Sequence, residues 1–152
     1  DAMNVVSTKS VIFINAEIKS RKAPNLMEFS MHHSEGFLKL VNAAKAKIKQ
    51  TTIDQVKKRM EDGEKICLID VREESEWEGG HIKGAQYLGK GVIERDIEVK
   101  FPDLKKELIF YCGGGFRSAL VCESLQKMGY QNVISMDGGW RGWNEKNYPI
   151  EK

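Results

Sequence analysis

The sequence predicts an α/β domain with a mainly parallel sheet flanked by helices. From residue 52 onward, short apolar runs alternate with segments of helical periodicity, which is the order expected of repeated βα units. The runs "KICLIDV" (65–71) and "ELIFYC" (107–112) are nearly continuous rather than alternating. Such runs are typical of parallel strands that are buried on both faces. No internal repeat or low-complexity segment interrupts this order.

The first 34 residues are predicted to form an N-terminal extension or arm outside the domain. Residues 5–19 suit a strand of mixed pattern, and the polar residues 20–34 suit a loop. A helix is expected over 34–50, with Ser34 as its N-cap and apolar residues at helical spacing: Phe37, Leu40, Val41, Ala44 and Ile48. We therefore expect the domain to span 35–152, with this helix preceding a core of about residues 50–150.

The remaining elements follow from capping residues, apolar runs and helix stops. Thr52 and Gln55 fit a capping box at the start of a second helix, which Gly63 ends. Gly129 is the expected C-terminal stop of a later helix. In chain order, we expect strands at 65–71, 85–89, 107–112 and 132–136, and helices at 51–63, within 72–85, and at 92–101, 117–129 and 138–149.

Length, charge and cysteine content limit the classes of protein that the chain suits. Its 152 residues suit one domain, and 24 basic against 22 acidic residues give a net charge of +2, so no nucleic-acid or membrane partner is expected. The longest apolar run near the start, Val11–Ile14, is too short to span a bilayer or serve as a secretory signal. Three cysteines, an odd number, favour free thiols in a reducing cytoplasm. They have no zinc spacing, and we expect neither a metal nor a cofactor.

The segment "ELIFYCGGGFRSALV" places a cysteine where an α/β sheet binds its ligands. Cys112 lies at the carboxyl end of a predicted strand, and the next helix begins near Arg117. The free N–H groups and the positive dipole end of that helix favour a thiolate at Cys112. Gly113, Gly114 and Gly115 allow successive N–H groups to form a nest for an anion, and Arg117 adds a planar fork suited to oxyanions. The prediction is a nucleophilic thiolate in an anion cradle; the alternative is an inert buried cysteine in a tight turn.

Four motifs in the same order resemble the rhodanese family of sulfurtransferases. "YCGGGFRSALVCESLQKMGY" is similar to the family's active-site loop and following helix, and "LIDVRE" (68–73) to its Asp-x-Arg after a buried strand. "GGHIKGA" (79–85) and "VISMDGGWRGW" (133–143) resemble its Gly-His-Ile-x-Gly-Ala and closing Gly-Gly-Trp segments. The resemblance covers about residues 50–150 and implies a single-domain rhodanese (thiosulfate sulfurtransferase) with a rhodanese-like doubly wound sheet.

The resemblance implies an enzyme that carries sulfur as a persulfide on Cys112. This cysteine takes a sulfane sulfur from a donor such as thiosulfate and passes it to a thiophilic acceptor, which is cyanide, a thiol or a protein. The negative charge of the persulfide is expected to be stabilised by the amides of Gly113, Gly114, Gly115, Phe116 and Arg117. Arg117 is also expected to bind anionic groups of the donor, and no cofactor is implied.

Further residues are expected to support or border the loop. In the family, an Asp and Arg pair such as Asp70 and Arg72 supports the active-site loop by hydrogen bonds. His81 is expected to be a hydrogen-bonded structural residue, because a preformed thiolate needs no general base. Phe116 is expected to line the loop entrance, and Cys122, which follows inside the helix, is expected to pack in the core.

Two alternative functions remain open at this level. The domain suits a persulfide carrier or sulfur-sensing module that docks a protein partner, because such a module uses the same loop. A cysteine phosphatase or arsenate reductase fits less well. Cysteine phosphatases place five residues between the cysteine and the arginine, whereas four separate Cys112 from Arg117. The shorter loop makes a smaller cradle, which suits a sulfur atom better than a tetrahedral phosphate.

Overall fold

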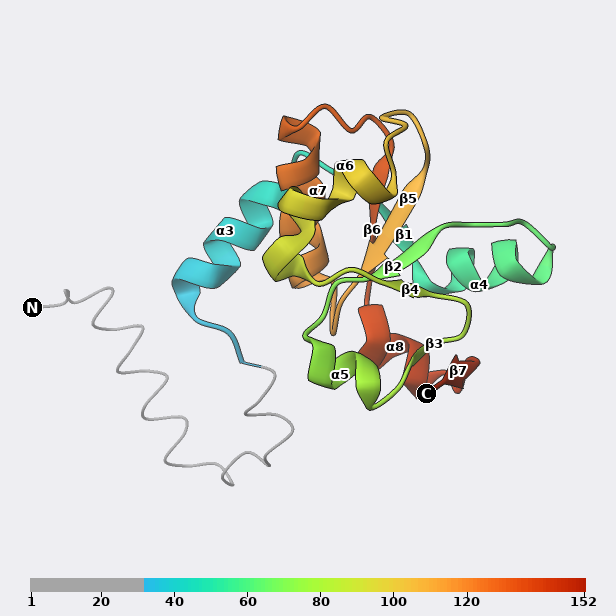
Figure 1. The fold of residues 1–152 in the computed structure, drawn as a ribbon. Helices are drawn as coiled ribbons and strands as arrows, with labels where there is room; N and C mark the ends of the chain where they lie inside the picture. The colour runs from blue at the N-terminus through green and yellow to red at the C-terminus, as the bar shows by residue number, and fades with distance from the viewer. Residues whose placement is uncertain (1–31) are drawn as a thin grey trace, which may run out of the picture. The chain divides into compact units, whose positions relative to one another are not determined.

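The computed structural model describes residues 32–152, so most of the expected N-terminal arm, with its strand and loop, lies outside the described residues. Residues Gly36–Lys152 form a compact unit. In chain order, the helices and strands of the described residues are α3 (Glu35–Lys45), β1 (Lys49–Thr52), α4 (Ile53–Glu61), β2 (Leu68–Asp70), α5 (Glu74–Glu78), β3 (His81–Ile82), β4 (Gln86–Tyr87), the 3₁₀ helix η1 (Lys90–Val92), α6 (Ile93–Lys100), β5 (Leu108–Tyr111), α7 (Phe116–Lys127), β6 (Val133–Asp137), α8 (Gly139–Glu145) and β7 (Ile150–Glu151) (Figure 1).

A five-stranded sheet in the order β1-β6-β5-β2-β4 forms the centre of the fold, and all of its strand pairs are parallel. Strand β5 lies in the middle, with Ile109 opposite Leu68 of β2 and Ile134 of β6. A separate antiparallel pair joins β3 to β7. The predicted α/β class with a mainly parallel sheet is therefore confirmed.

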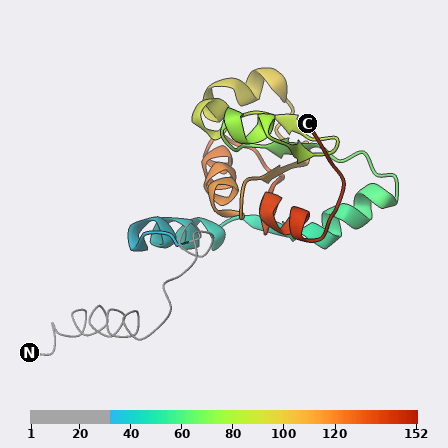
Figure 2. The same ribbon diagram turned by 90° about the horizontal axis from the view of Figure 1, so that it is seen from below.

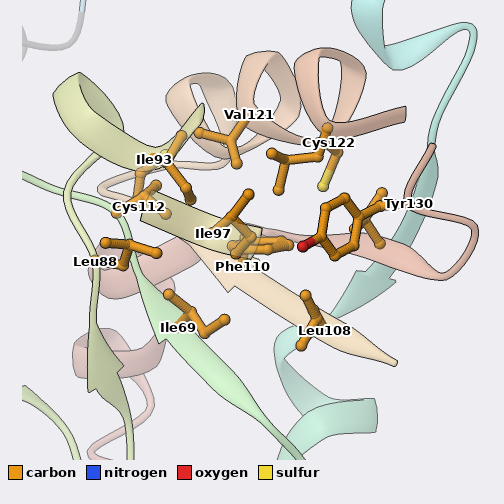
Figure 3. Close-up of a cluster of buried hydrophobic side chains, with 13 residues drawn as sticks. Ile69, Leu88, Ile93, Ile97, Leu108, Phe110, Cys112, Val121, Cys122 and Tyr130 are labelled. Carbon is orange, nitrogen blue, oxygen red and sulfur yellow. The ribbon is translucent and has the colours of Figure 1, made fainter. Parts of the chain in front are cut away.

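Helices cover both faces of this sheet, as a doubly wound fold requires (Figures 1 and 2). The alternation of side chains along β5 explains how one strand serves both layers. Leu108, Phe110 and Cys112 belong to the buried cluster that includes residues of α6 and α7, and Figure 3 shows this cluster. Ile109 and Tyr111 belong to the second cluster, with residues of α4 and α8. Because both faces of β5 are covered, its sequence is a continuous apolar run.

The predicted helix signals are present at two helices. The Thr52 hydroxyl accepts a hydrogen bond from the N–H of Gln55 at 3.1 Å, and the Gln55 side chain accepts one from the N–H of Thr52 at 3.1 Å, so the capping box of α4 is formed. Helix α7 is followed by Gly129, whose φ of +103° is the left-handed conformation that glycine adopts at a helix end.

Three short strands, β1, β3 and β7, are not predicted from the sequence, because none of them has a local pattern of its own. The sequence of β1, "KQTT", is polar and largely exposed, so no apolar pattern marks it. The sequence predicts its first two residues as the end of one helix and its last two as the start of the next, but α3 ends at Lys45 and α4 begins at Ile53. The strands β3 and β7 have two residues each and are defined only by their pairing with each other. Local sequence carries little information on such edge pairings.

Within residues 32–152, the helices are all too short or too polar to pass through a lipid bilayer.

Candidate active site

The predicted loop connects β5 to α7 at the carboxyl end of the central strand. Cys112 directly follows β5, and α7 begins at Phe116. Between them, Gly115 is the N-cap of α7 and has a φ of +102°. A side chain at Gly115 would be strained by that φ and would lie 3.0 Å from Oδ1 of Asp137. This glycine therefore allows the chain to turn directly from the strand into the helix.

Two backbone N–H groups meet at the cysteine sulfur: that of Gly115, which is one of the five amides predicted from the sequence, and that of Ser118, which was not predicted. The N–H groups of Gly115 and Ser118 donate to Sγ of Cys112 at 3.2 and 3.3 Å. The Cys112 thiol lies 3.6 Å from Oγ of Ser118, which in turn is 2.8 Å from Oγ of Ser135. Cys112 is 1% exposed, and both serines are fully buried. A helix N-terminus with oriented amides in a buried setting stabilises a negative charge on sulfur.

The two serines are functional candidates that sequence reasoning missed. Ser118 is the third residue of α7, and this position after a glycine-rich loop is the signal that its N–H points back at the loop. Ser135 lies on the neighbouring strand β6, and no local pattern connects it to Cys112. Together they place a buried chain of two hydroxyls beside the sulfur.

The N-terminus of α8 also holds the loop, through hydrogen bonds to the carbonyl oxygens of the loop. The N–H of Trp140 donates to the carbonyl oxygen of Cys112 at 2.8 Å, and the N–H of Arg141 donates to that of Gly113 at 2.9 Å. The N–H of Gly138 donates to the carbonyl oxygen of Gly114 at 3.2 Å. The loop carbonyls are therefore engaged by α8, which fixes the peptide planes whose N–H groups surround the sulfur.

Gly139 lets α8 approach the loop this closely. Its φ is +53°, and a Cβ there would collide with the carbonyl oxygen of Cys112 and lie 2.9 Å from the carbonyl carbon of Gly113. These are backbone atoms, so they move only if the loop moves. The Gly-Gly-Trp segment thus has a physical role in seating the cysteine loop, which its motif alone did not reveal.

We expect Gly139→Ala to lower the free energy of unfolding by about 2–4 kcal/mol, because the added methyl displaces the loop. For the same reason we expect it to slow the sulfur uptake that the sequence predicts at Cys112 by more than about tenfold. Urea unfolding and uptake kinetics measure the two effects. The matched control is Gly36→Ala in α3, where an added Cβ meets no atom within 4 Å. Normal stability and uptake in Gly139→Ala would show that the loop does not depend on this contact.

Arg117 lies at the rim of the loop and is paired with a carboxylate. Its Nη1 donates to Oε2 of Glu76 at 2.8 Å, and its Nη2 donates to Oε1 at 3.2 Å, which is a bidentate pair. Hydrogen bonding to Arg117 lowers the pKa of Glu76, and the same contact raises the pKa of Arg117. The sequence did not identify Glu76, because this pairing of α5 with α7 leaves no trace in the local pattern.

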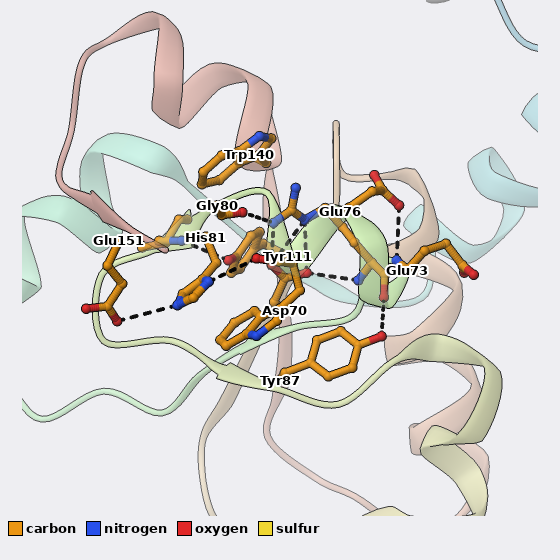
Figure 4. Close-up of polar contacts among 12 residues, drawn as sticks. Asp70, Glu73, Glu76, Gly80, His81, Tyr87, Tyr111, Trp140 and Glu151 are labelled. Atoms are coloured by element: carbon orange, nitrogen blue, oxygen red, sulfur yellow. Dashed lines mark hydrogen bonds and ion pairs between the residues drawn. The ribbon is translucent and has the colours of Figure 1, made fainter.

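Asp70 and Arg72, which are expected to support the loop, form a buried ion pair. Nη2 of Arg72 lies 2.7 Å from Oδ2 of Asp70 and donates to the carbonyl oxygen of Gly80, also at 2.7 Å (Figure 4). The guanidinium carbon lies 4.5 Å from the centre of the Trp140 ring. The hydrogen bonds of the Arg72 guanidinium therefore end on Asp70 and Gly80 rather than on the loop. Trp140, which contacts Arg72 through its ring, contacts the loop through its N–H, which donates to the carbonyl oxygen of Cys112.

His81 has the geometry of a structural residue, because its ring is held by two contacts outside the loop. Its Nδ1 is 3.2 Å from the carbonyl oxygen of Trp77, and its Nε2 is 3.6 Å from Oε2 of Glu151 (Figure 4). The imidazole stacks on the Trp77 ring, with 3.4 Å between the ring centres. It thus joins α5 to the strand β7.

The ring of Phe116, which is expected at the loop entrance, has its packing partners on another helix. Its ring centre lies 6.1 Å from that of Phe37, and Nζ of Lys45 lies 4.8 Å from the ring centre. Both partners belong to α3, so the ring packs against that helix. The position of Phe116 in the loop is visible in the sequence, whereas its packing partner on α3 is not.

The other two cysteines differ from Cys112 in their surroundings. Cys122 is fully buried in the core cluster, as predicted, and burial raises the pKa of its thiol (Figure 3). Cys67 is partly buried, and burial raises its pKa as well. All three thiols are free. No cluster of three or more His, Cys, Asp or Glu side chains in residues 32–152 is suited to a metal ion.

Comparison with known proteins gives a consistent match. The family described as "Rhodanese-like domain" matches residues 52–146. A putative sulfurtransferase of Bacillus subtilis, YtwF, is 34% identical over 102 residues, which cover 67% of this chain and 96% of the relative. The thiosulfate sulfurtransferase GlpE of Haemophilus influenzae is 32% identical over 103 residues, covering 68% of this chain and 94% of the relative.

A solved structure shares the fold over most of the chain. It is a Rhodopseudomonas palustris protein of unknown function, described as a possible tyrosine phosphatase, with a TM-score of 0.68 and 29% identity. The match covers 80% of this chain and 98% of that one.

Proposed function

The chain belongs to the rhodanese-like domain family, and we propose that it moves a sulfane sulfur from thiosulfate to a thiophilic acceptor through a persulfide on Cys112. Relatives named as sulfurtransferases support sulfur transfer in general. We propose three specifics beyond this: thiosulfate as the donor, a thiophilic acceptor, and Cys112 as the residue that carries the sulfur.

The observation that carries the proposal is the surroundings of the Cys112 sulfur. Two backbone N–H groups, of Gly115 and Ser118, donate to it at the N-terminus of α7. Preorganised donors of this kind stabilise a sulfur anion without a neighbouring base. A thiolate and a persulfide both carry one negative charge, so the same donors serve the enzyme before and after sulfur uptake.

The chemistry needs only this sulfur and two substrates. The Cys112 thiolate attacks the outer sulfur of thiosulfate, the S–S bond of the donor breaks, and sulfite leaves with the bonding electron pair. The enzyme retains a persulfide anion. Cyanide or a thiolate then attacks the outer sulfur of the persulfide, and the Cys112 thiolate leaves from the new S–S bond. With cyanide the product is thiocyanate, and charge balances in each step.

The persulfide has hydroxyl groups available as well as amides. Ser118 and Ser135 are buried and share a hydrogen bond of 2.8 Å next to the sulfur. If Ser135 donates to Ser118, the Ser118 hydroxyl is free to turn and donate to a sulfur anion. These serines would extend the set of donors beyond the amides that the sequence predicted.

Free thiols suit the reducing cytoplasm that the sequence predicts. A persulfide carrier must keep its cysteine out of disulfides, and Cys67, Cys112 and Cys122 are all free. We therefore place the reaction in a compartment where cellular thiols are available as acceptors.

Phosphate transfer is the competing function, and the description of the R. palustris structure motivates it. The loop has four residues between Cys112 and Arg117, three of them glycine. In addition, Arg117 has a bidentate contact with Glu76, whose carboxylate opposes a phosphate at the same guanidinium. The spacing favours sulfur over phosphate, whereas the carboxylate of Glu76 opposes any anionic substrate at Arg117.

The test is a pair of assays on the full chain. We expect thiocyanate to form from thiosulfate and cyanide with ping-pong kinetics, because the persulfide separates the two half-reactions. We expect no hydrolysis of p-nitrophenyl phosphate. Phosphate release without thiocyanate would contradict the proposal. The carrier function would be indicated instead if the protein holds a full complement of persulfide, transfers it slowly to cyanide, and transfers it faster to a protein that offers an acceptor thiol.

A further inference from the structure

The rim of the cysteine loop carries a second arginine, which the proposed mechanism does not use. Arg141 is the third residue of α8, and its N–H holds the carbonyl oxygen of Gly113. Arg141 is exposed to solvent. Its guanidinium extends over the loop, because Nη1 lies 2.9 Å from the place where a Cβ of Gly114 would lie.

Glycine at 113 and 114 leaves room for two guanidinium groups. A Cβ at Gly113 would lie 3.1 Å from Nη2 of Arg117 and 4.0 Å from Nη2 of Arg141. Both arginines therefore flank the same short stretch of backbone. The glycines that follow Cys112 serve this approach as well as the backbone turn.

The charges of the two arginines are compensated unequally. Glu76 pairs with Arg117 through two hydrogen bonds. Among residues 32–152, no carboxylate forms an ion pair with Arg141. Asp137, which also lies beside the loop, pairs with Lys45 at 3.3 Å. The rim thus has an uncompensated positive charge beside Gly113 and Gly114.

We propose that Arg141 binds the anionic end of the sulfur donor, with the sulfonate of thiosulfate over Gly113 and Gly114 and its outer sulfur directed to Cys112. A planar guanidinium matches two oxygens of such a group. Arg141 is then the residue that selects a dianionic donor. The choice of thiosulfate rests on the proposed function, whereas the anion site itself does not.

Sulfur uptake tests the donor assignment. We expect Arg141→Gln to lower kcat/KM for thiosulfate about tenfold or more, mainly through KM, because a nearby charge is lost. Arg141→Lys keeps the charge without the fork and should give an intermediate value. The control, Arg95→Gln on α6, makes the same change in net charge at an exposed position and should stay within about twofold of the parent protein.

Alkylation of Cys112 tests the anion site without any transfer of sulfur. Iodoacetate is an anion and iodoacetamide is neutral, and both attack the same sulfur. We expect Arg141→Gln to lower the ratio of the iodoacetate rate to the iodoacetamide rate at the peptide that carries Cys112, while the iodoacetamide rate stays unchanged.

The two readouts separate the proposals. An unchanged alkylation ratio together with unchanged thiosulfate kinetics would overturn the role of Arg141 and leave the proposed function standing. If the parent protein takes up no sulfur from thiosulfate but the alkylation ratio falls in Arg141→Gln, the anion site stands and the proposed donor is wrong.

Discussion

Replacing Cys112 with serine is expected to lower thiocyanate formation from thiosulfate by more than about a thousandfold, because removing an enzyme's covalent nucleophile removes most of its rate enhancement. A hydroxyl at this position stays protonated at neutral pH, and it forms no persulfide. The substitution is nearly isosteric and the serine hydroxyl can hydrogen-bond Ser118, so the fold should persist. Steady-state assays and a circular dichroism melt of the same sample measure both quantities.

Two cysteine variants control for this result. Cys67→Ala and Cys122→Ala each remove a thiol that burial keeps protonated, so sulfur transfer should continue at the parental rate. Cys122→Ala removes a buried sulfur from the core cluster and should cost about 1–2 kcal/mol of stability. A folded Cys122→Ala protein that loses activity would mean that Cys122, ten residues beyond Cys112, takes part in the reaction.

The second large effect is expected at the buried ion pair. Replacing Arg72 with methionine should lower the free energy of unfolding by about 3–5 kcal/mol, because it leaves a buried carboxylate without its cation. Asp70 is fully buried and Arg72 is 2% exposed, so water cannot take over the lost contacts. The carbonyl oxygen of Gly80 also loses its donor, and Trp140 loses the cation beside its ring. Urea unfolding measures the change.

A double variant distinguishes the unpaired charge from lost packing. Asp70→Leu combined with Arg72→Met replaces both charges, and it should be less destabilising than the sum of the two single variants. If the single Arg72→Met change costs less than about 1 kcal/mol, the pair is not the structural support that its burial indicates. Equal costs for the double variant and the sum of the singles would show that the two side chains act independently.

Sequence reasoning succeeded where several signals coincide at one place. The run from Leu108 to Tyr111 is a buried central strand, and the glycine-rich turn after Cys112 does bring N–H groups to the sulfur. Both follow from local rules: the run is apolar because both faces of β5 are covered, and glycine permits the left-handed conformation at Gly115. The fold class follows from the same alternation of strands and helices.

The contacts that complete the site could not be predicted in this way. Glu76 contacts Arg117 from 41 residues away, and Ser135 approaches Ser118 from a neighbouring strand. Phe116 packs on α3, which precedes the residues matched by the family. Each of these contacts depends on where the sheet places elements that are distant in sequence, which no local pattern records.

The most direct measurement is the mass of the protein after incubation with thiosulfate, followed by trypsin digestion. Cleavage after Lys and Arg separates the three cysteines into the peptides 66–72, 107–117 and 118–127. The persulfide mechanism predicts one added sulfur atom per chain, found in peptide 107–117 and removed by cyanide as thiocyanate. No retained sulfur, or sulfur in either of the other two peptides, would contradict the assignment of Cys112 as the sulfur carrier.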